Sequence, residues 1–223
     1  RRGLELLVHT GICDIVLPEV SALQDTVDEH RRHKDVYEHT LTVLQQAMDL
    51  ETGPDGDVPG PDLRLRLAAL LHDIGKPATR RFMPDGTVTF HAHDYVGARM
   101  TAKRMRALHF DKQTIKDVSR LVELHLRFHG YADSPWSDSA VRRYVTDAGP
   151  LLARLGCLTR ADVTTGNRRK AAMLSHAYDD LERRIEALRQ QEELASIRPE
   201  LDGQEIMAEL DIKPGPEVGK AYK

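Results

Sequence analysis

The feature that most constrains the fold is an apolar stretch that runs directly into a histidine and an aspartate. Residues 63–71 are leucine or alanine except for two arginines, and His72 and Asp73 follow without a break. A helix of this composition has no wide polar face, so we expect it to be buried together with both side chains. An unpaired buried carboxylate is costly unless a cation or metal ion matches its charge, or unless it takes up a proton. Metal ligation is therefore the first hypothesis, and a buried salt-bridged network is the alternative.

Two more polar side chains interrupt the apolar faces of predicted helices. A helix is expected from about residue 36 to residue 50, and His39 lies on its inward side. A second apolar stripe over residues 151–162 ends in Asp162, where helical periodicity calls for another apolar residue. Together with the histidine-aspartate pair, these residues offer two nitrogen and two oxygen ligands from three helices and leave room for water or substrate. Such a mixed set suits Mn, Fe, Ni, Zn or Mg.

Further histidines could complete a second metal position or bind a phosphate. His125 and His129 are four residues apart on one predicted helical stripe, and His91 and His93 alternate in a predicted extended segment that projects both to one side. We take His93, His125 and His129 as the candidates for this second position. A core histidine bonded to a backbone carbonyl is the more ordinary explanation of each one taken singly, and it stays open.

The order of these residues along the chain resembles a known superfamily. His39, then His72 and Asp73 followed by Lys76, and then a distant Asp162 are similar to the pattern of HD-domain metal-dependent phosphohydrolases. The resemblance implies an all-α bundle in which His39, His72, Asp73 and Asp162 bind a divalent metal. It also implies phosphoester hydrolysis at that metal, with His72, Asp73 and Lys76 as the catalytic residues.

Neighbouring segments narrow the resemblance. Residues 2–7, 33–40 and 90–98 resemble the C-terminal portion of bacterial tRNA nucleotidyltransferases, the CCA-adding enzymes of the poly(A) polymerase family, and the likeness is closest to the actinobacterial type. This resemblance implies tRNA as the partner and Mg with CTP and ATP as requirements of the full-length enzyme. It also implies 2′,3′-cyclic phosphodiesterase, 2′-nucleotidase or phosphatase activity in the HD domain. One departure is Ala92, which stands where the family usually has glycine.

The sequence shows no sign of the polymerase active site. The family holds two metal ions and the incoming nucleotide on a strand-borne Gly-Ser followed by a paired Asp-x-Asp, and we find no such segment between Arg1 and Lys223. The chain also starts without methionine, so we expect it to be the C-terminal part of a longer protein. Two alternatives remain: a tRNA-binding body with a structural or idle metal site, and a stand-alone HD nucleotide phosphohydrolase.

Basic residues are unevenly spread along a chain whose formal net charge is −3. That charge argues against general binding of polyanions, but clusters of Lys and Arg can contact phosphates and make binding strongly salt dependent. The resemblance to a tRNA-handling family favours this interpretation, and a solvated surface is the alternative. The candidate RNA contacts are Arg99, Lys103, Arg104, Arg142, Arg143, Arg168, Arg169 and Lys220.

We predict an all-α protein in three parts: a helical lead-in over residues 1–30, an HD-domain bundle over 31–166, and a long helix with the start of a tRNA-binding tail over 167–223. One small β-hairpin is expected at about 80–90, because a Pro-Asp-Gly turn lies between two short strand-like segments. The long helix carries an apolar seam, which could pack on the same chain, as we favour, or pair with a second copy in a homodimer.

Cysteine usage and hydropathy indicate where in the cell the protein is found. Cys13 and Cys157 fall within apolar helical patterns, which predicts two buried thiols and no disulfide framework. No apolar run approaches the roughly 20 residues of a membrane span, and no N-terminal segment has the pattern of a signal peptide. We therefore expect a cytoplasmic protein that does not bind membranes.

Overall fold

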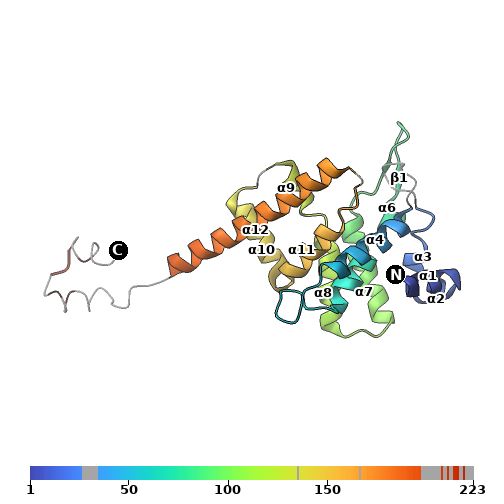
Figure 1. Cartoon of the computed structure of the whole chain (residues 1–223), viewed down its shortest axis with the longest axis horizontal. Helices are drawn as coiled ribbons and strands as arrows, with labels where there is room; N and C mark the ends of the chain where they lie inside the picture. Colours follow the sequence, from blue (N-terminus) through green and yellow to red (C-terminus); the bar gives the residue numbers. More distant parts are fainter. Residues whose placement is uncertain are drawn as a thin grey trace. The chain divides into compact units, whose positions relative to one another are not determined.

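The computed structural model describes residues 1–26, 35–134, 136–165 and 167–196, with a few positions nearer the C-terminus. The chain divides into two compact units, Arg1–Glu182 and Arg183–Lys223. Helices dominate the described residues, and their only sheet has two strands, which confirms the predicted all-α class with one hairpin (Figure 1). No helix among these residues is long and apolar enough to cross a membrane.

The chain begins with a short helical lead-in. Gly11 separates the first two helices and has a φ of 73°, a left-handed conformation that favours glycine. Cys13 is buried there, whereas Cys157 is only partly buried, which corrects the prediction of two buried thiols. The helices of the lead-in are α1 (Arg2–His9), α2 (Ile12–Val16) and α3 (Pro18–Ser21).

The core of the first unit is built on helices that begin at aspartate caps. In α4 (Val36–Asp49) the Asp35 carboxylate accepts a hydrogen bond from the backbone N–H of Glu38, and in α5 (Leu63–Leu71) Asp62 does the same for Leu65. Such caps satisfy backbone donors that a helix leaves free at its start. Helix α5 is largely buried, as its composition predicts. The fully buried leucines of the core include one from each of four helices: Leu41, Leu65, Leu121 and Leu155.

The predicted hairpin follows directly after α5 and the short helix α6 (Lys76–Thr79). Its strands are β1 (Arg81–Phe82) and β2 (Val88–Thr89), paired in antiparallel fashion. Gly86 has a φ of 78° and donates its N–H to the carbonyl of Met83, which closes the turn. The hairpin stands out from the helical body of the first unit (Figure 1).

A helical pair follows the hairpin and completes the bundle. Helices α7 (His93–Ala107) and α8 (Lys112–Leu124) pack side by side, and α8 also packs on α5 (Figure 1). The next elements are α9 (His129–Asp133), α10 (Asp138–Ala148), the 3-10 helix η1 (Gly149–Leu151) and α11 (Leu152–Ala161).

Two local expectations about histidines are wrong. Helix α8 ends at Leu124, so His125 caps it and His129 opens α9 after a turn, and the two are not on one continuous stripe. Likewise, strand β2 ends at Thr89, so His91 lies in a turn and His93 is the first residue of α7. In both places the chain changes direction where the sequence pattern alone suggests continuity.

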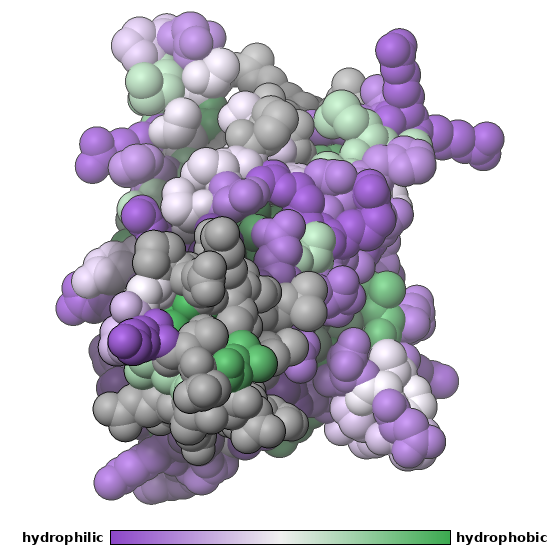
Figure 2. Space-filling view, turned by 90° about the vertical axis from the view of Figure 1, so that its left-hand side faces the viewer, coloured by the Kyte–Doolittle hydropathy of each residue, from purple (hydrophilic) through white to green (hydrophobic). Residues whose placement is uncertain are grey.

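The long helix α12 (Arg168–Ser196) agrees with the prediction, and its N-terminal part packs within the first unit. The ring of Tyr178 stacks on Phe128, with centroids 3.5 Å apart, and the guanidinium of Arg160 lies 5.0 Å from the centroid of the same tyrosine ring. This part of α12 thus packs on the same chain, as we favoured. The coloured part of the face in Figure 2 is mainly hydrophilic, with hydrophobic residues in small, separate patches.

Candidate metal centre

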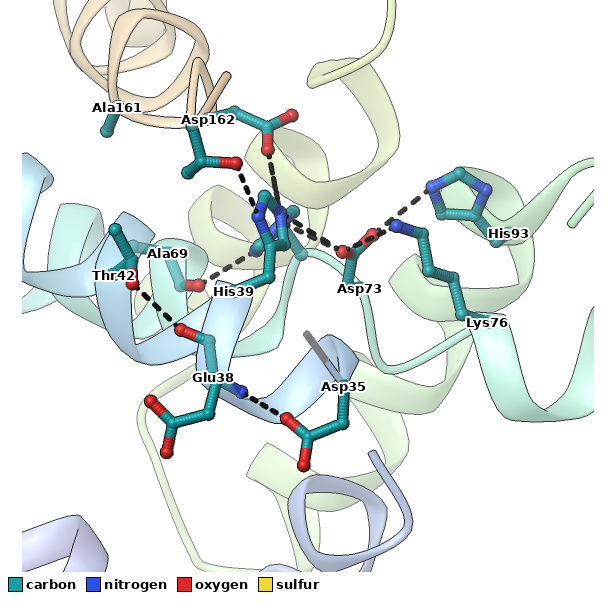
Figure 3. Close-up of polar contacts among 12 residues, drawn as sticks. Asp35, Glu38, His39, Thr42, Ala69, Asp73, Lys76, His93, Ala161 and Asp162 are labelled. Carbon is teal, nitrogen blue, oxygen red and sulfur yellow. Dashed lines mark hydrogen bonds and ion pairs between the residues drawn. The ribbon is translucent and has the colours of Figure 1, made fainter. Parts of the chain in front are cut away.

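Three helices bring the predicted ligands together at their ends. His39 lies on α4, His72 and Asp73 come directly after α5, and Asp162 follows α11. The end of α11 is held against α4 because the side-chain amide of Gln46 donates to the carbonyl of Ala161 at 2.6 Å. Figure 3 shows His39 between the two carboxylates, with Lys76 beside Asp73. The four residues predicted from periodicity therefore form one cluster.

The ligand atoms of this cluster face one another at short distances. The Nε2 atom of His39 is 3.0 Å from Oδ1 of Asp162 and 3.5 Å from Oδ2 of Asp73. The Nε2 atom of His72 is 3.2 Å from the same Asp73 oxygen and 3.3 Å from Nε2 of His39. His72 and Asp73 are 0% and 1% exposed, whereas the side chains of His39 and Asp162 are each 15% exposed, so the cluster is open to solvent only on the side of these two residues. His39, His72 and Asp162 form a group that could hold a metal ion.

The opposite nitrogen of each of the four histidines in the centre is already engaged. Because a carbonyl oxygen only accepts, an Nδ1 bonded to one carries the proton, and in the neutral ring Nε2 keeps its lone pair for the centre. The Nδ1 contacts are His72 to the carbonyl of Ala69 at 2.9 Å, His93 to that of Phe90 at 2.8 Å, His125 to that of Val122 at 2.6 Å, and His39 to the hydroxyl of Thr164 at 3.0 Å.

The two carboxylates of the cluster favour a positive charge on or between the ring nitrogens that face them. Burial lowers the pKa of His72, but Asp73 and Asp162 more than offset this and raise it to about 10. Burial also works to raise the pKa of Asp73, yet the positive charges of His72 and Lys76 hold it well below its usual value. A divalent cation can supply the same charge in place of the proton on His72.

A second group of possible ligands contains Asp73, whose Oδ2 faces His39 and His72 of the first group. Its members are Asp73, His93 and His125, all buried, with Nε2 of His93 at 3.3 Å from Oδ1 of Asp73. Burial, together with the positive charge of His72, lowers the pKa of His125 to about 4, so this ring is neutral near pH 7. Its Nε2 is buried and has no hydrogen-bond partner among the residues that the structure describes. A buried lone pair without a partner is unfavourable, and a metal ion or a donor on a substrate would satisfy it.

Lys76 provides the salt bridge that the sequence leaves open as an alternative to a metal. Its Nζ lies 2.9 Å from Oδ2 of Asp73 and 5.6 Å from the centroid of the Phe90 ring. One ammonium group balances one carboxylate here. It does not satisfy Nε2 of His125, and it does not separate the facing Nε2 atoms of His39 and His72, so the donor set still fits a divalent ion.

A close backbone approach places His93 beside Asp73. A Cβ atom added at Gly75 would lie 2.1 Å from the carbonyl oxygen of His93 and 2.7 Å from the N atom of Gly97. Only glycine allows the turn after α5 to lie this close to the start of α7. Ala92, which caps α7, has a φ of 60°, so the position where the family usually has glycine is indeed a left-handed one.

Some predicted residues lie outside the cluster. His129 is exposed and belongs to neither group of possible ligands, because the turn after α8 carries it away, and His91 is also exposed. Thr164 and the carbonyls that orient the rings were not predicted. The three carbonyls share a signal that could have found them, since each lies three residues before its histidine at a helix end or turn.

The predicted RNA contacts differ in whether their side chains are exposed. Arg104 is already engaged within the chain, because its guanidinium forms a bidentate ion pair with the carboxylate of Glu19, at 2.8 and 3.0 Å. Lys220 and the neighbouring Gly219 lie outside the described residues. The exposed members of the set are Arg99, Lys103, Arg142, Arg143, Arg168 and Arg169.

Comparison with known proteins agrees with this geometry. The model of the HD domain family matches residues 36–167. The A-adding tRNA nucleotidyltransferase of Deinococcus radiodurans is 35% identical over 225 residues, which cover 100% of this chain and 49% of that protein. The CC-adding enzyme of Thermus thermophilus is 34% identical, with 99% and 47% covered. A multifunctional CCA protein of Neisseria gonorrhoeae is 31% identical over 131 residues, 58% of this chain and 29% of the relative.

The matches show how much of each relative corresponds to this chain. The chain spans about half the length of the two tRNA nucleotidyltransferases that it matches from end to end. The HD family model covers α4 to the loop after α11, which contains every residue of both ligand groups. The chain therefore belongs to the HD domain family, and its whole length is similar to about half of two bacterial tRNA nucleotidyltransferases.

Proposed function

We propose that this chain is the HD-domain portion of a tRNA nucleotidyltransferase and that its HD centre hydrolyses phosphoesters. The observation that carries the hydrolytic part is the convergence of four Nε2 atoms and two carboxylates, including the unsatisfied Nε2 of His125. A buried ring nitrogen without a partner is unfavourable, and a metal ion or a donor on a substrate would satisfy it. The tRNA part rests on similarity to proteins named as A-adding and CC-adding tRNA nucleotidyltransferases.

The residues present fit one divalent ion and offer a second position. His39, His72, Asp73 and Asp162 would hold the first ion, while Asp73, His93 and His125 would hold a second ion or a substrate phosphate. A divalent ion in such a centre neutralises charge on phosphate oxygens and lowers the pKa of a water molecule that it carries. The mixed nitrogen and oxygen set is compatible with Mn, Ni, Fe, Zn or Mg.

The side chains of the centre would orient the substrate. Lys76 is anchored by Asp73 and Phe90, so its ammonium group can bind a phosphate oxygen without a large rearrangement. The hydroxyl of Thr164 and the carbonyl of Ala69 keep the rings of His39 and His72 fixed. These contacts favour a preorganised site, with His72, Asp73 and Lys76 as the catalytic residues.

For the whole protein, we infer tRNA as the partner and addition of nucleotides to its 3′ end, with Mg and CTP or ATP used by the part that this chain lacks. The relatives differ in whether they are named for adding A or CC, so the added base stays open. The exposed arginines and lysine on α7, α10 and α12 are the proposed phosphate contacts: Arg99, Lys103, Arg142, Arg143, Arg168 and Arg169.

A second candidate is a tRNA-binding body whose HD centre is idle. The ion pair between Lys76 and Asp73 favours it, because this contact stabilises the buried carboxylate without a metal. The two candidates differ in whether the purified chain turns over a substrate, because a structural or idle site can also carry metal.

The test is hydrolysis by the purified chain with added Mn, Ni or Mg. We expect turnover of a 2′,3′-cyclic nucleotide or a small phosphomonoester, and we expect His72→Ala to abolish it while circular dichroism shows a retained fold. His129→Ala is the matched control, because this histidine is exposed and lies outside both ligand groups. Absence of turnover with all three metals would support the idle centre.

A further inference from the structure

We propose that the hairpin β1–β2 and the start of α7 form a stacking surface for single-stranded RNA, which presents its phosphates to the HD centre. The surface is defined by Arg80, Arg81, Phe82, Tyr95 and Arg99. As a route to substrate it rests on the proposed hydrolytic function, whereas RNA binding to it can be tested without any hydrolysis.

Two aromatic rings are held out of the core on this surface. Phe82 is 72% exposed and Tyr95 is 55% exposed. Both residues of β1 are exposed, and the strand pairs only with β2, so nothing among the described residues covers the Phe82 ring. Short single strands bind proteins by stacking their bases on such rings, which is tolerant of sequence.

Each exposed ring is accompanied by an arginine. The guanidinium of Arg80 lies 5.5 Å from the centroid of the Phe82 ring, and that of Arg99 lies 6.0 Å from the centroid of Tyr95. A guanidinium beside a ring keeps donors available for phosphate while it extends the flat surface on which a base can stack. The two pairs therefore combine the aromatic and cationic contacts that single-stranded RNA needs.

The charge of this region is opposite to that of the chain. Residues 76–106 contain seven lysines and arginines and two aspartates, although the formal net charge of the whole sequence is −3. Two of the seven are already paired, Arg104 with Glu19 and Lys76 with Asp73, so five basic residues remain against two aspartates in this segment. This complementarity favours a polyanion over an apolar protein partner as the occupant.

The segments just before and just after the hairpin each contribute a residue to the metal centre. Lys76, four residues before Arg80, lies 2.9 Å from Asp73, and His93, four residues after Thr89, lies 3.3 Å from the same carboxylate. Four residues span at most ~14 Å, so the stacking surface cannot lie far from the centre. Phe82 lies six residues after Lys76, at most ~22 Å along the chain, so a short strand whose base stacks on Phe82 could bring a phosphate to Lys76.

The test measures binding of a fluorescein-labelled single-stranded oligoadenylate by anisotropy in the presence of EDTA. We expect Phe82→Ala to weaken binding roughly tenfold and Phe82→Leu to do the same, because leucine keeps the apolar area but cannot stack, whereas Phe82→Trp should retain binding. Ile15→Ala is the matched control, since Ile15 is 80% exposed on α2, in the lead-in. Arg81→Gln should lower the slope of log K against log salt by about 0.7.

The possible outcomes distinguish the proposed stacking surface from the proposed hydrolytic activity. Wild-type affinity in Phe82→Ala, or equal affinity for duplex RNA, would overturn the stacking surface even if the chain hydrolyses cyclic nucleotides. Conversely, tight binding that depends on Phe82, with no hydrolysis of any phosphoester, would support the surface and remove only the proposed activity of the HD centre. Because Phe82 is exposed, its variants should melt with the wild type, which circular dichroism checks.

Discussion

Asp73 lies between the two ligand groups and contacts residues of both. One of its oxygens faces His39, His72 and Lys76, while the other faces His93. Each neighbour has its own support from a backbone carbonyl, a hydroxyl or a ring, whereas Asp73 depends on all of them. Loss of this carboxylate therefore leaves several cationic or donor groups buried without a counter-charge.

Replacement of Asp73 by alanine should remove bound metal and destabilise the fold. Elemental analysis after incubation with Mn and dialysis should show metal in the wild type and little in Asp73→Ala, and the variant should unfold at lower temperature, because the histidines lose the ion that organises them. Asp55→Ala is the control, since that carboxylate is exposed in the loop after α4. A wild type that takes up no metal, with Lys76 still paired to Asp73, would contradict the prediction.

Asp62 provides a pH dependence that is separate from the metal centre. Burial works to raise its pKa, but hydrogen bonds from Arg154, at 2.7 and 2.9 Å, and from the N–H of Leu65 lower it overall. A carboxyl group whose pKa is lower in the folded state contributes stability above the unfolded pKa of about 3.9 and loses it as pH falls through the folded value.

Asp62→Asn should therefore be less stable than the wild type by about 1 to 3 kcal/mol at pH 7, because Arg154 loses its charged partner. The difference should shrink as pH falls below about 4, because the unfolded wild type then takes up a proton, and it should vanish only below the lowered pKa of the folded carboxyl group. Urea unfolding at several pH values measures both effects. A difference that is constant with pH would show that the ion pair does not contribute.

Among the elements, the turn between α5 and α6 decides whether α7 can reach the centre. Gly75 contacts the backbone of α7 so closely that no side chain fits. A displacement of the turn would therefore also displace the start of α7, and the second ligand group exists only if both stay in place. This is a property of two packed elements, since neither segment requires glycine by itself.

Gly75→Ala should lower the free energy of unfolding by about 3 kcal/mol or more, because backbone atoms must shift to admit the methyl group. It should also weaken metal binding, because His93 is displaced from Asp73. Gly53→Ala is the matched control, since a Cβ atom there meets nothing within 4 Å. Equal urea midpoints for the two variants would mean that the approach of α7 can relax at little cost.

At the scale of the whole molecule, the chain corresponds to about half of the tRNA nucleotidyltransferases that it resembles. Nucleotidyl transfer needs carboxylates that hold two metal ions against a triphosphate. The chain has one Asp-x-Asp, at Asp55 and Asp57, and both residues lie in an exposed loop between α4 and α5, far from any strand in the sequence.

The chain by itself should therefore add neither C nor A to a truncated tRNA. Incubation with radiolabelled CTP or ATP, Mg and tRNA should leave the tRNA unlabelled, while weak tRNA binding that falls steeply with salt is expected from the exposed arginines. Incorporation of label by this chain would show that a polymerase site lies within residues 1–223. Salt-insensitive binding would assign the arginines to a solvated surface.

Local rules in the sequence determine the helices, the hairpin turn and the four polar residues that interrupt apolar faces. His39, His72, Asp73 and Asp162 can be found this way, because burial of a helical face depends on periodicity within the helix and a charged group there needs a partner. The exact partner cannot be found in this way, so the sequence leaves metal and salt bridge both open.

Only the tertiary structure decided which further groups join them. It included His93 and His125 and excluded His129, because membership depends on where α8 ends and on how closely α7 approaches the turn at Gly75. It also joined Arg104 to Glu19 across 85 residues of chain. Contacts of this kind arise when distant segments meet in space, and no periodicity within one segment records them.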